Sequence, residues 1–352
     1  MAKRTTHGGV DAERATVKDV AARAGVSTAT VSRVLSGDYP VSTATRAKVQ
    51  RAVRDLDYVA NAQARALKGS GPKLVAFVLE DVTGPSFAYV AKGVEQQATA
   101  EGRLCLVCTT HGDPARELAV IEAMRAQHAD AVILVGGGSF GAEHQARMAY
   151  FAHALERSGS RLVLAGRPPL GGDVPATVVE YDNEGGAYGM TSYLLSQGHR
   201  QIVFLGAQDD HTTSRDRVTG FTRAHQAYGL PAGTVLPGVF TRDSGYAQAR
   251  RLLDSREPFT AVFAATDVVA SGVLQALREA SLRVPEDVSV VGYDDVPLTL
   301  DLVPALTTVH VPTEELGRTA VRLALHPEER QHVVLGTHVV IRDSVARVPM
   351  KD

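Results

Sequence analysis

The chain has 352 residues, a formal net charge of −2 and 44% hydrophobic residues, which is typical of a globular protein of two or three domains. It contains no run of about 18 apolar residues and no apolar signal-peptide core, so we expect a cytoplasmic protein with no membrane partner. Residues 1–71 carry 12 Lys/Arg and 6 Asp/Glu, whereas the remainder carries 25 and 33. This basic head on an acidic body indicates that only the head binds a polyanion.

Residues 16–35 follow a polar stretch, 1–15, that is expected to be a disordered tail. They have the sequence TVKDVAARAGVSTATVSRVL, which predicts two helices joined by a tight turn. Thr16 is a good N-cap, and the carboxylate of Asp19 would lie near the positive end of the first helix. Gly25 stands where such a turn needs a positive φ angle.

The apolar spacing over about residues 17–36 is that of a helix-turn-helix, which places its second helix in the major groove of DNA. Ala21 is the small residue that two steeply crossing helices need at their contact. An ordinary helical hairpin is the alternative. A third helix is expected from Ser42, its N-cap, to about Leu56, within a domain that spans residues 16–60. The residues expected to face the core are Val17, Val20, Ala21, Ala24, Val31, Val34, Leu35, Val49, Val53 and Leu56.

Residues 61–72, NAQARALKGSGP, form either a plain linker or a short helix that begins at Asn61 and ends at Gly69. Such a helix is too short to be stable alone in water. Leu67 stands between basic residues there. It is either a local core contact or a wedge that inserts between base pairs in the minor groove.

From Lys73 onward, short apolar runs alternate with helical stretches. The runs are continuous, which is typical of strands buried on both faces of a parallel sheet that helices cover. About 270 residues of this pattern exceed one sheet, so we expect two lobes with ligands bound between them. The expected strands are 74–80, 104–108, 131–135, 162–166, 177–181, 202–206, 261–265 and 288–293, and the expected helices lie near 86–102, 114–127, 143–158, 183–198, 214–229, 244–256 and 267–281.

Three patterns that could carry chemistry have simpler explanations. GGGSFG at 136–141 matches the dinucleotide-binding fingerprint but follows a third strand, which favours a plain glycine loop. Cys105 and Cys108, three residues apart on an expected strand, point to opposite faces, and no second Cys/His pair stands near them. The neighbours Asp294 and Asp295 have no partner carboxylate, and neither G-x-S-x-G nor H-E-x-x-H occurs. We therefore expect no catalytic residues, no metal ligands and no cofactor.

Arg217 lies in TTSRDRVTGF, just inside a helix that follows the strand IVFLG. A residue at this carboxyl edge of a sheet can reach a ligand between the lobes. The alternative is a surface arginine that pairs with Asp216 or Asp210.

Further segments that carry a family resemblance follow the helix-turn-helix in a characteristic order and spacing. They are VSTATRAKV and YVANAQARALKG, then DNEGGAYGMTSYLLSQGHRQIVFLG, RVTGF, VFTRDSGY, ATDVVASGVLQALREASLRVPEDVSVVGYDD and PALTTVHVP. On these segments the chain resembles the lactose-repressor (LacI/GalR) family of bacterial regulators, from Thr16 to about Val345. The resemblance implies a helix-turn-helix domain followed by a two-lobed effector domain like a type I periplasmic binding protein. It also implies a transcriptional regulator, a repressor, that binds a pseudo-palindromic DNA operator as a homodimer.

The resemblance further implies that the second helix contacts base edges through Thr28, Ala29 and Arg33. Arg33 suits a bidentate contact with guanine. Residues 61–68 would be a hinge helix that folds only on operator DNA, with Leu67 as the minor-groove wedge. The other implied DNA contacts are Ser27, Thr30 and Ser32, nearer the phosphates, and Asn61, Ala64 and Lys68 in the hinge helix.

For the body, the resemblance implies one lobe of residues 73–180 and 311–332 and a second lobe of residues 181–310 and 333–345. A small-molecule effector, a sugar or sugar derivative, would bind between them and control the grip on DNA. The residues implied to line this site are Ser86, Phe87, Arg217, Phe240, Thr266 and Asp294.

The chain departs from the family pattern in three places. Ala60 stands where the family often has proline, which loosens the start of the hinge. Gly166, followed by Arg167, stands where it often has aspartate, which leaves the class of ligand open. No leucine heptads occur near the end of the sequence, so a dimer is implied rather than a tetramer. The alternative class of protein is a cytoplasmic NAD-dependent or other α/β enzyme with a basic appendage.

Overall fold

The computed structural model describes residues 15–36, 40–58, 73–139, 141–327 and 332–348. The chain divides into two compact units, Met1–Pro72 and Lys73–Asp352. Nearly all of the expected tail and the whole of the expected linker, residues 61–72, lie outside the described residues.

The first unit contains three described helices, α1 (Val17–Ala24), α2 (Thr28–Ser36) and α3 (Thr43–Asp55). The backbone N–H of Thr16 donates to Asp19 Oδ2 at 2.7 Å, so the expected cap of α1 is confirmed. Gly25 has φ +66° and its N–H group bonds back to α1, as the turn requires. Ser42 accepts from the N–H of Thr45 at 3.2 Å and caps α3.

The core of this unit is small and is filled from all three helices. Val31 of α2 is fully buried and Val34 is nearly so, whereas Leu35 is 39% exposed. The expectation that Leu35 faces the core is therefore wrong. Consecutive residues of a helix lie about 100° apart, and α1 and α3 cover only the side of α2 that carries Val31 and Val34.

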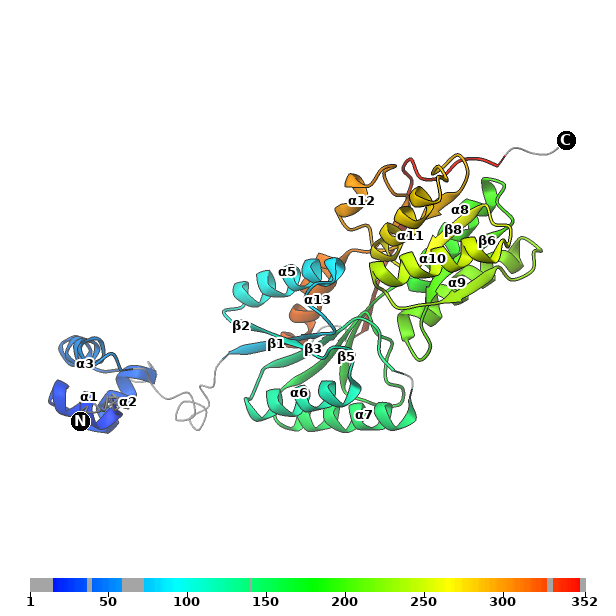
Figure 1. Cartoon of the computed structure of the whole chain (residues 1–352). Coiled ribbons are helices and arrows are strands. Elements are labelled where there is room, and N and C mark those ends of the chain that lie inside the picture. Colours follow the sequence, from blue (N-terminus) through cyan, green and yellow to red (C-terminus); the bar gives the residue numbers. More distant parts are fainter. Residues whose placement is uncertain (1–14, 37–39, 59–72, 140, 328–331, 349–352) are drawn as a thin grey trace, which may run out of the picture. The chain divides into compact units, whose positions relative to one another are not determined.

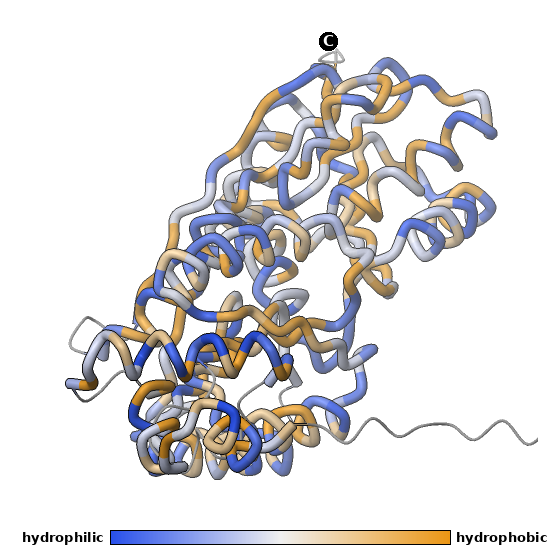
Figure 2. Tube along the Cα trace, turned by 90° about the vertical axis from the view of Figure 1, so that its left-hand side faces the viewer, coloured by the Kyte–Doolittle hydropathy of each residue, from blue (hydrophilic) through white to orange (hydrophobic). Residues whose placement is uncertain are grey.

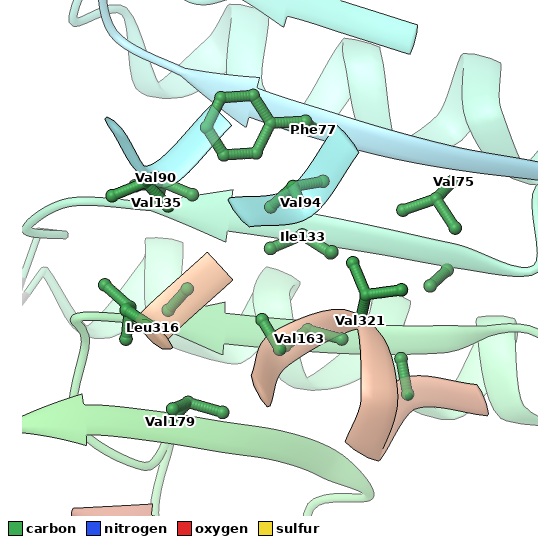
Figure 3. Packing of buried hydrophobic residues seen from close by; sticks show 14 of the residues in the cluster. Val75, Phe77, Val90, Val94, Ile133, Val135, Val163, Val179, Leu316 and Val321 are labelled. Carbon is green, nitrogen blue, oxygen red and sulfur yellow. The ribbon is translucent and has the colours of Figure 1, made fainter. Parts of the chain in front are cut away.

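The second unit begins with a six-stranded parallel sheet of strand order β11-β5-β4-β3-β1-β2. Helices α5 and α13 cover one face and α6 and α7 cover the other (Figure 1). Figure 3 shows Val94, Leu316 and Val321 of the first pair of helices lying over the valines and isoleucine of the strands. The elements are β1 (Leu74–Leu79), α5 (Pro85–Ala100), β2 (Leu104–Thr109), α6 (Pro114–Ala126), β3 (Ala131–Val135), α7 (Ala142–Arg157), β4 (Arg161–Ala165), β5 (Ala176–Tyr181), α13 (Thr313–Leu325) and β11 (His332–Leu335).

A second parallel sheet has four strands in the order β7-β6-β8-β9. Helices α8 and α9 pack on one face, and α10 and α11 pack on the other. Hydrophilic and hydrophobic residues follow one another closely along single helices, as expected for helices with one buried face (Figure 2). The elements are α8 (Asn183–Ser196), β6 (Ile202–Ala207), α9 (Thr212–Ala227), β7 (Thr234–Pro237), α10 (Arg242–Ser255), β8 (Ala261–Ala264), α11 (Asp267–Glu279), β9 (Ser289–Val291) and α12 (Leu298–Asp301).

The chain passes between the two sheets three times. The first two passages follow Tyr181 and the strand β10 (Thr308–His310), where they were expected. The third was expected near residue 332 but follows Leu335, because β11 pairs with β5 along its whole length. The strand β12 (His338–Val340) then pairs antiparallel with β10.

Two further expectations need correction. Strand β2 is not buried on both faces: it lies at the edge of its sheet, with Leu104 71% exposed. The helix α13 was not expected, although its side chains cover a large part of the first sheet. In the described part of the chain, no helix is both long and apolar enough to span a membrane.

Candidate functional site

Helix α2 has one face turned away from the core of the first unit. Thr28, Ala29 and Arg33 are exposed on it, and Thr30 and Ser32 are half-buried. Ser27 accepts from the N–H of Thr30 at 3.1 Å, so its hydroxyl caps the helix and holds the amino-terminal end of α2 in shape. An exposed helix of this width fits the major groove of B-DNA. The predicted hinge contacts Asn61, Ala64, Leu67 and Lys68 lie outside the described residues.

Arg217 lies in α9 and is 1% exposed, so the alternative of a surface arginine is wrong. Its guanidinium donates to Asn183 Oδ1 at 2.9 Å, to the carbonyl oxygen of Ala265 at 2.5 Å and to Asp294 Oδ1 at 3.1 Å. Of the two surface partners in that alternative, Asp216 instead accepts from Arg215 at 2.9 Å and Asp210 accepts from Ser139 at 2.5 Å. Arg217 and Asp294 thus form a buried ion pair where strands β6, β8 and β9 end.

The electrostatics of this pair follow from its burial. Burial would lower the pKa of Arg217, but the charge of Asp294 and two nearby tyrosines raise it, so the guanidinium stays protonated. Burial raises the pKa of Asp294 against the opposing effect of Arg217. Because the two charges compensate each other, the pair adds hydrogen-bonding capacity to the site without adding net charge.

Aromatic rings surround the guanidinium. Its Cζ lies 3.7 Å from the ring centroid of Tyr293 and 5.8 Å from that of Phe240. The hydroxyl of Tyr181 accepts from Arg217 at 3.5 Å. Arrangements of this kind bind hydroxyl groups at the polar end and pack a ring against the aromatic face.

The structure brings together four of the six predicted effector residues. Arg217, Asp294 and Phe240 are in contact, and Thr266 follows Ala265, the carbonyl partner of Arg217. The hydroxyl of Thr266 accepts from Val269 N–H at 3.2 Å, so it also caps α11. The remaining two, Ser86 and Phe87, lie in the first turn of α5 beside the other sheet, and both are half-buried.

Sequence reasoning missed three residues of this site, Tyr181, Asn183 and Tyr293. Tyr181 is the last residue of β5 and Tyr293 stands two residues after β9, so their places near strand ends are a signal that could have found them. A Cβ atom on Gly166 would lie 3.0 Å from the ring of Tyr181, so this ring occupies the space of a side chain at 166.

The glycine loop at 136–139 contacts the lobe that contains the four-stranded sheet. The N–H of Thr212 donates to the carbonyl of Gly138 at 3.1 Å, and the N–H of Gly138 donates to Thr212 Oγ1 at 3.1 Å. Gly136 has φ +83°, and a Cβ atom there would lie 3.0 Å from the ring of Phe87. These close approaches explain the glycines without a bound dinucleotide.

Arg167 is also buried, and it pairs with Glu117 of α6. The guanidinium donates to both carboxylate oxygens, at 3.0 and 2.6 Å, and to the carbonyl of Gly136 at 2.8 Å. It therefore holds the base of the glycine loop.

The two cysteines lie on β2 and contact opposite faces of the first sheet, as expected. Burial raises the pKa of Cys105 to about 11, which makes its thiol unreactive at neutral pH. In the part of the chain that the structure describes, no group of three or more His, Cys, Asp or Glu side chains is placed to hold a metal ion.

These features define a class of protein: a helix-turn-helix unit joined to a two-sheet body of the periplasmic binding type, with a buried polar site at its strand ends. Comparison with known families agrees. Residues 16–61 match the family of bacterial regulatory proteins named lacI, and residues 191–345 match a periplasmic binding protein-like domain.

Curated relatives extend this match over most of the chain. The chain is 32% identical to the HTH-type transcriptional regulator DegA of Bacillus subtilis (strain 168), over 95% of its own length and 98% of that protein. It is 33% identical to the ribose operon repressor of Escherichia coli (strain K12), over 89% and 92%. The chain therefore belongs to the lacI family of DNA-binding transcriptional regulators, and these relatives are regulators rather than enzymes.

Solved structures show the same architecture. The lac repressor bound to ONPG in the repressed state matches with a TM-score of 0.81 and 25% identity, over 95% of this chain and all of that one. The complex of the transcriptional regulator CelR with cellobiose matches with a TM-score of 0.66 and 33% identity, over 94% and 100%.

Proposed function

We propose that this protein represses transcription by binding a pseudo-palindromic operator as a homodimer, and that a sugar or sugar derivative bound in the body controls this binding. The observation that carries the proposal is the Arg217–Asp294 pair. A buried ion pair that is also surrounded by aromatic rings is costly to build and seldom contributes much to stability alone. Its hydrogen-bonding groups suit recognition of a small hydroxylated ligand.

On the DNA side, Arg33, Thr28 and Ala29 contact base edges, and Ser27, Thr30 and Ser32 lie near phosphates. The exposure of Thr28, Ala29 and Arg33 on α2 supports the base-edge assignment. We further propose that residues 61–68, which lie outside the described residues, form a hinge helix on operator DNA and insert Leu67 into the minor groove.

On the ligand side, the names of relatives support a sugar. One curated relative is a ribose operon repressor. A lacI family regulator from Enterococcus faecium has been solved with bound ribose, at 25% identity and a TM-score of 0.69, over 79% of this chain and 100% of that one. The site residues are Ser86, Phe87, Arg217, Phe240, Thr266 and Asp294.

The dimer forms through the apolar edge of the first sheet. Strand β2 exposes 71% of Leu104, 41% of Leu106 and 47% of Val107. Three large apolar side chains on one edge strand invite association unless another surface covers them. A second copy of the chain covers this edge, which matches the two-fold symmetry of the operator.

Regulation requires that the ligand binds the DNA-competent state and the released state with different affinity. Residues from both lobes contact each other around Gly138 and Thr212, so a change in the spacing of the lobes alters the site. We propose that the same change alters operator binding.

A gel-shift titration of the full chain on the DNA upstream of its own gene tests the proposal. The expected result is a discrete complex that survives random competitor DNA at a stated salt concentration and whose amount changes with a sugar. Equal binding to every duplex, with or without sugars, contradicts it.

Base contact by Arg33 is tested by Arg33→Ala. Loss of a bidentate base contact lowers specific affinity by about 1–3 kcal/mol, whereas nonspecific affinity changes much less. Arg51→Ala, on the exposed side of α3, removes the same charge as a control. An equal loss in specific and nonspecific binding for Arg33→Ala removes its role in base recognition.

A further inference from the structure

Two histidines face each other on strands that border the passages between the two sheets. His310 ends β10 and His338 begins β12, and they are direct partners in the antiparallel pairing of these strands. Their ring centroids lie 4.8 Å apart, with an angle of 35° between the ring planes. Because β10 comes just before the second passage and β12 just after the third, the two rings join two of the segments that connect the lobes.

A carboxylate orients the ring of His310. Asp295 Oδ2 lies 2.9 Å from Nδ1 of His310, and a carboxylate oxygen accepts, so Nδ1 carries the proton and donates. In the neutral ring, Nε2 then carries the lone pair. The other oxygen of Asp295 accepts from Arg342 Nη2 at 2.6 Å, which holds the carboxylate in place. Metal-binding histidines have this arrangement, because a carboxylate on one ring nitrogen fixes the tautomer and raises the basicity of the other.

The separation of the two rings fits two imidazoles bound to one metal ion. At a metal–nitrogen distance of about 2.1 Å and a bond angle at the metal of about 90–109°, the ring centroids lie about 4.6–5.3 Å apart. The 4.8 Å between His310 and His338 falls within this range. Packing of the two rings against each other without a metal is the alternative.

The pair is accessible to solvent. His338 is exposed, and His310 exposes 38% of its side chain. The charge of Arg342, which shares the carboxylate with His310, is compensated by Asp295. A cation can therefore approach two neutral imidazoles beside a charge pair that is already neutralised. No metal ligands were expected from the sequence, because these histidines lie in different segments and only the strand pairing brings them together.

We propose that His310 and His338 form a binding site for a divalent transition-metal ion of the imidazole-preferring class, such as Zn²⁺ or Cu²⁺. Both imidazoles are ligands, water completes the coordination, and Asp295 is a positioning residue for His310. The bound ion ties β10 to β12 and so restrains two of the segments that connect the lobes. The site does not rest on the function proposed above, because it requires neither DNA nor an effector.

Calorimetric titration of the full chain, without an affinity tag, with Zn²⁺ and with Cu²⁺ tests the site. His338→Gln removes one imidazole and should weaken binding of the ion at least tenfold. Because His338 is exposed, the melting temperature of the metal-free protein should not change. His153→Gln, at an exposed histidine of α7, is the matched control and should bind like wild type. Equal affinities in wild type and His338→Gln overturn the inference, as does a wild type that binds neither ion.

The positioning role of Asp295 is tested separately. Asp295→Asn can donate to Nδ1 of His310, which moves the ring proton to Nε2 and blocks the ligand atom. Metal affinity should therefore fall by about tenfold or more. Imidazole ¹⁵N spectra of the metal-free wild type give a readout that does not depend on how this variant folds: the His310 ring should carry its proton on Nδ1. A neutral His310 ring with its proton on Nε2 overturns the role of Asp295.

Hydrogen exchange measured by mass spectrometry tests the link between the strands. Saturating Zn²⁺ should slow amide exchange in residues 308–310 and 338–340 of the wild type, because the ion opposes separation of β10 from β12. The same concentration should leave exchange in these residues of His338→Gln unchanged. Protection confined to other segments, or equal protection in both proteins, overturns the inference.

Discussion

At the scale of single residues, burial decides the role of a charged side chain, because a buried side chain makes its hydrogen bonds to protein groups instead of water. Arg217 and Arg215 are both arginines two positions apart in α9. Arg215 is exposed, whereas Arg217 is enclosed by Asn183, Asp294 and aromatic rings. A buried guanidinium keeps its charge and its fork geometry, so its bonds are directional.

Arg217→Ala should abolish the response of operator binding to the effector and leave operator binding itself intact. The substitution leaves Asp294 buried without its partner, which costs about 3–5 kcal/mol in the body. Arg217→Lys keeps the charge but not the fork, and it should fold while still losing most of the response. Gel shifts with and without effector measure this, with Arg215→Ala as the matched control. A full response in Arg217→Lys contradicts the assignment.

Glu117 should make the body less stable in acid. Burial would raise the pKa of Glu117, but the charge of Arg167 and hydrogen bonds from His144 and Arg167 outweigh it and lower the pKa to about 2. Because the folded pKa lies below the unfolded value of 4.5, the stabilisation is complete above pH 4.5 and is lost as the pH falls toward 2. Its full size is about 3 kcal/mol.

The test compares the unfolding free energies of wild type and Glu117→Gln between pH 7 and pH 3. The difference in unfolding free energy should shrink below pH 4.5, because the wild type then loses the stabilisation by ionised Glu117, which Glu117→Gln lacks at every pH. Glu122→Gln, in an exposed pair with Arg125, is the control and should show a much smaller difference. A difference that stays constant with pH refutes the assignment.

At the scale of elements, pairs of helices in the body cross at glycines. In α5 and α13, a Cβ atom on Gly93 would collide with the main chain of Glu314, and one on Gly317 would collide with the main chain of Val90. Main-chain atoms cannot rotate away as a side chain can. The two helices therefore pack at a distance that only glycine permits.

Gly93→Ala should destabilise the body by about 1–3 kcal/mol, because the strain exceeds the gain in helix propensity. Gly189→Ala in α8 is the matched control. A Cβ atom there meets only Val339 at 3.6 Å, an ordinary contact, so this variant should be neutral or more stable by up to about 1 kcal/mol. Chemical denaturation measures both, and equal effects would show that the helix crossing is not close enough to matter.

At the scale of the whole molecule, the described residues leave an apolar edge exposed along β2. Leu106→Lys places a charge on this edge without touching the core, so the monomer should remain folded. We expect light scattering to show a shift from dimer to monomer and operator affinity to fall at least tenfold. Tyr150→Lys, a 61% exposed aromatic residue on α7, should leave the dimer unchanged. A dimeric Leu106→Lys protein contradicts this interface.

Local sequence determined much of the architecture. The caps at Thr16 and Ser42, the turn at Gly25 and the continuous apolar strands other than β2 depend on neighbouring residues and on periodicity, and the structure confirms them. The sequence also singled out Arg217 by its place just after a strand. These signals are short-range, so they can be recognised without knowing which segments meet.

The tertiary structure alone decided which segments are covered, which strands pair and which side chains form the site. The exposure of Leu35 and of β2 depends on which helices cover them, and the place of β11 depends on pairing with a strand about 150 residues away. The closure of Tyr181, Asn183 and Tyr293 around Arg217 and the meeting of His310 with His338 arise from long-range packing. No periodicity records such contacts, because the residues that make them come together only when both sheets are complete.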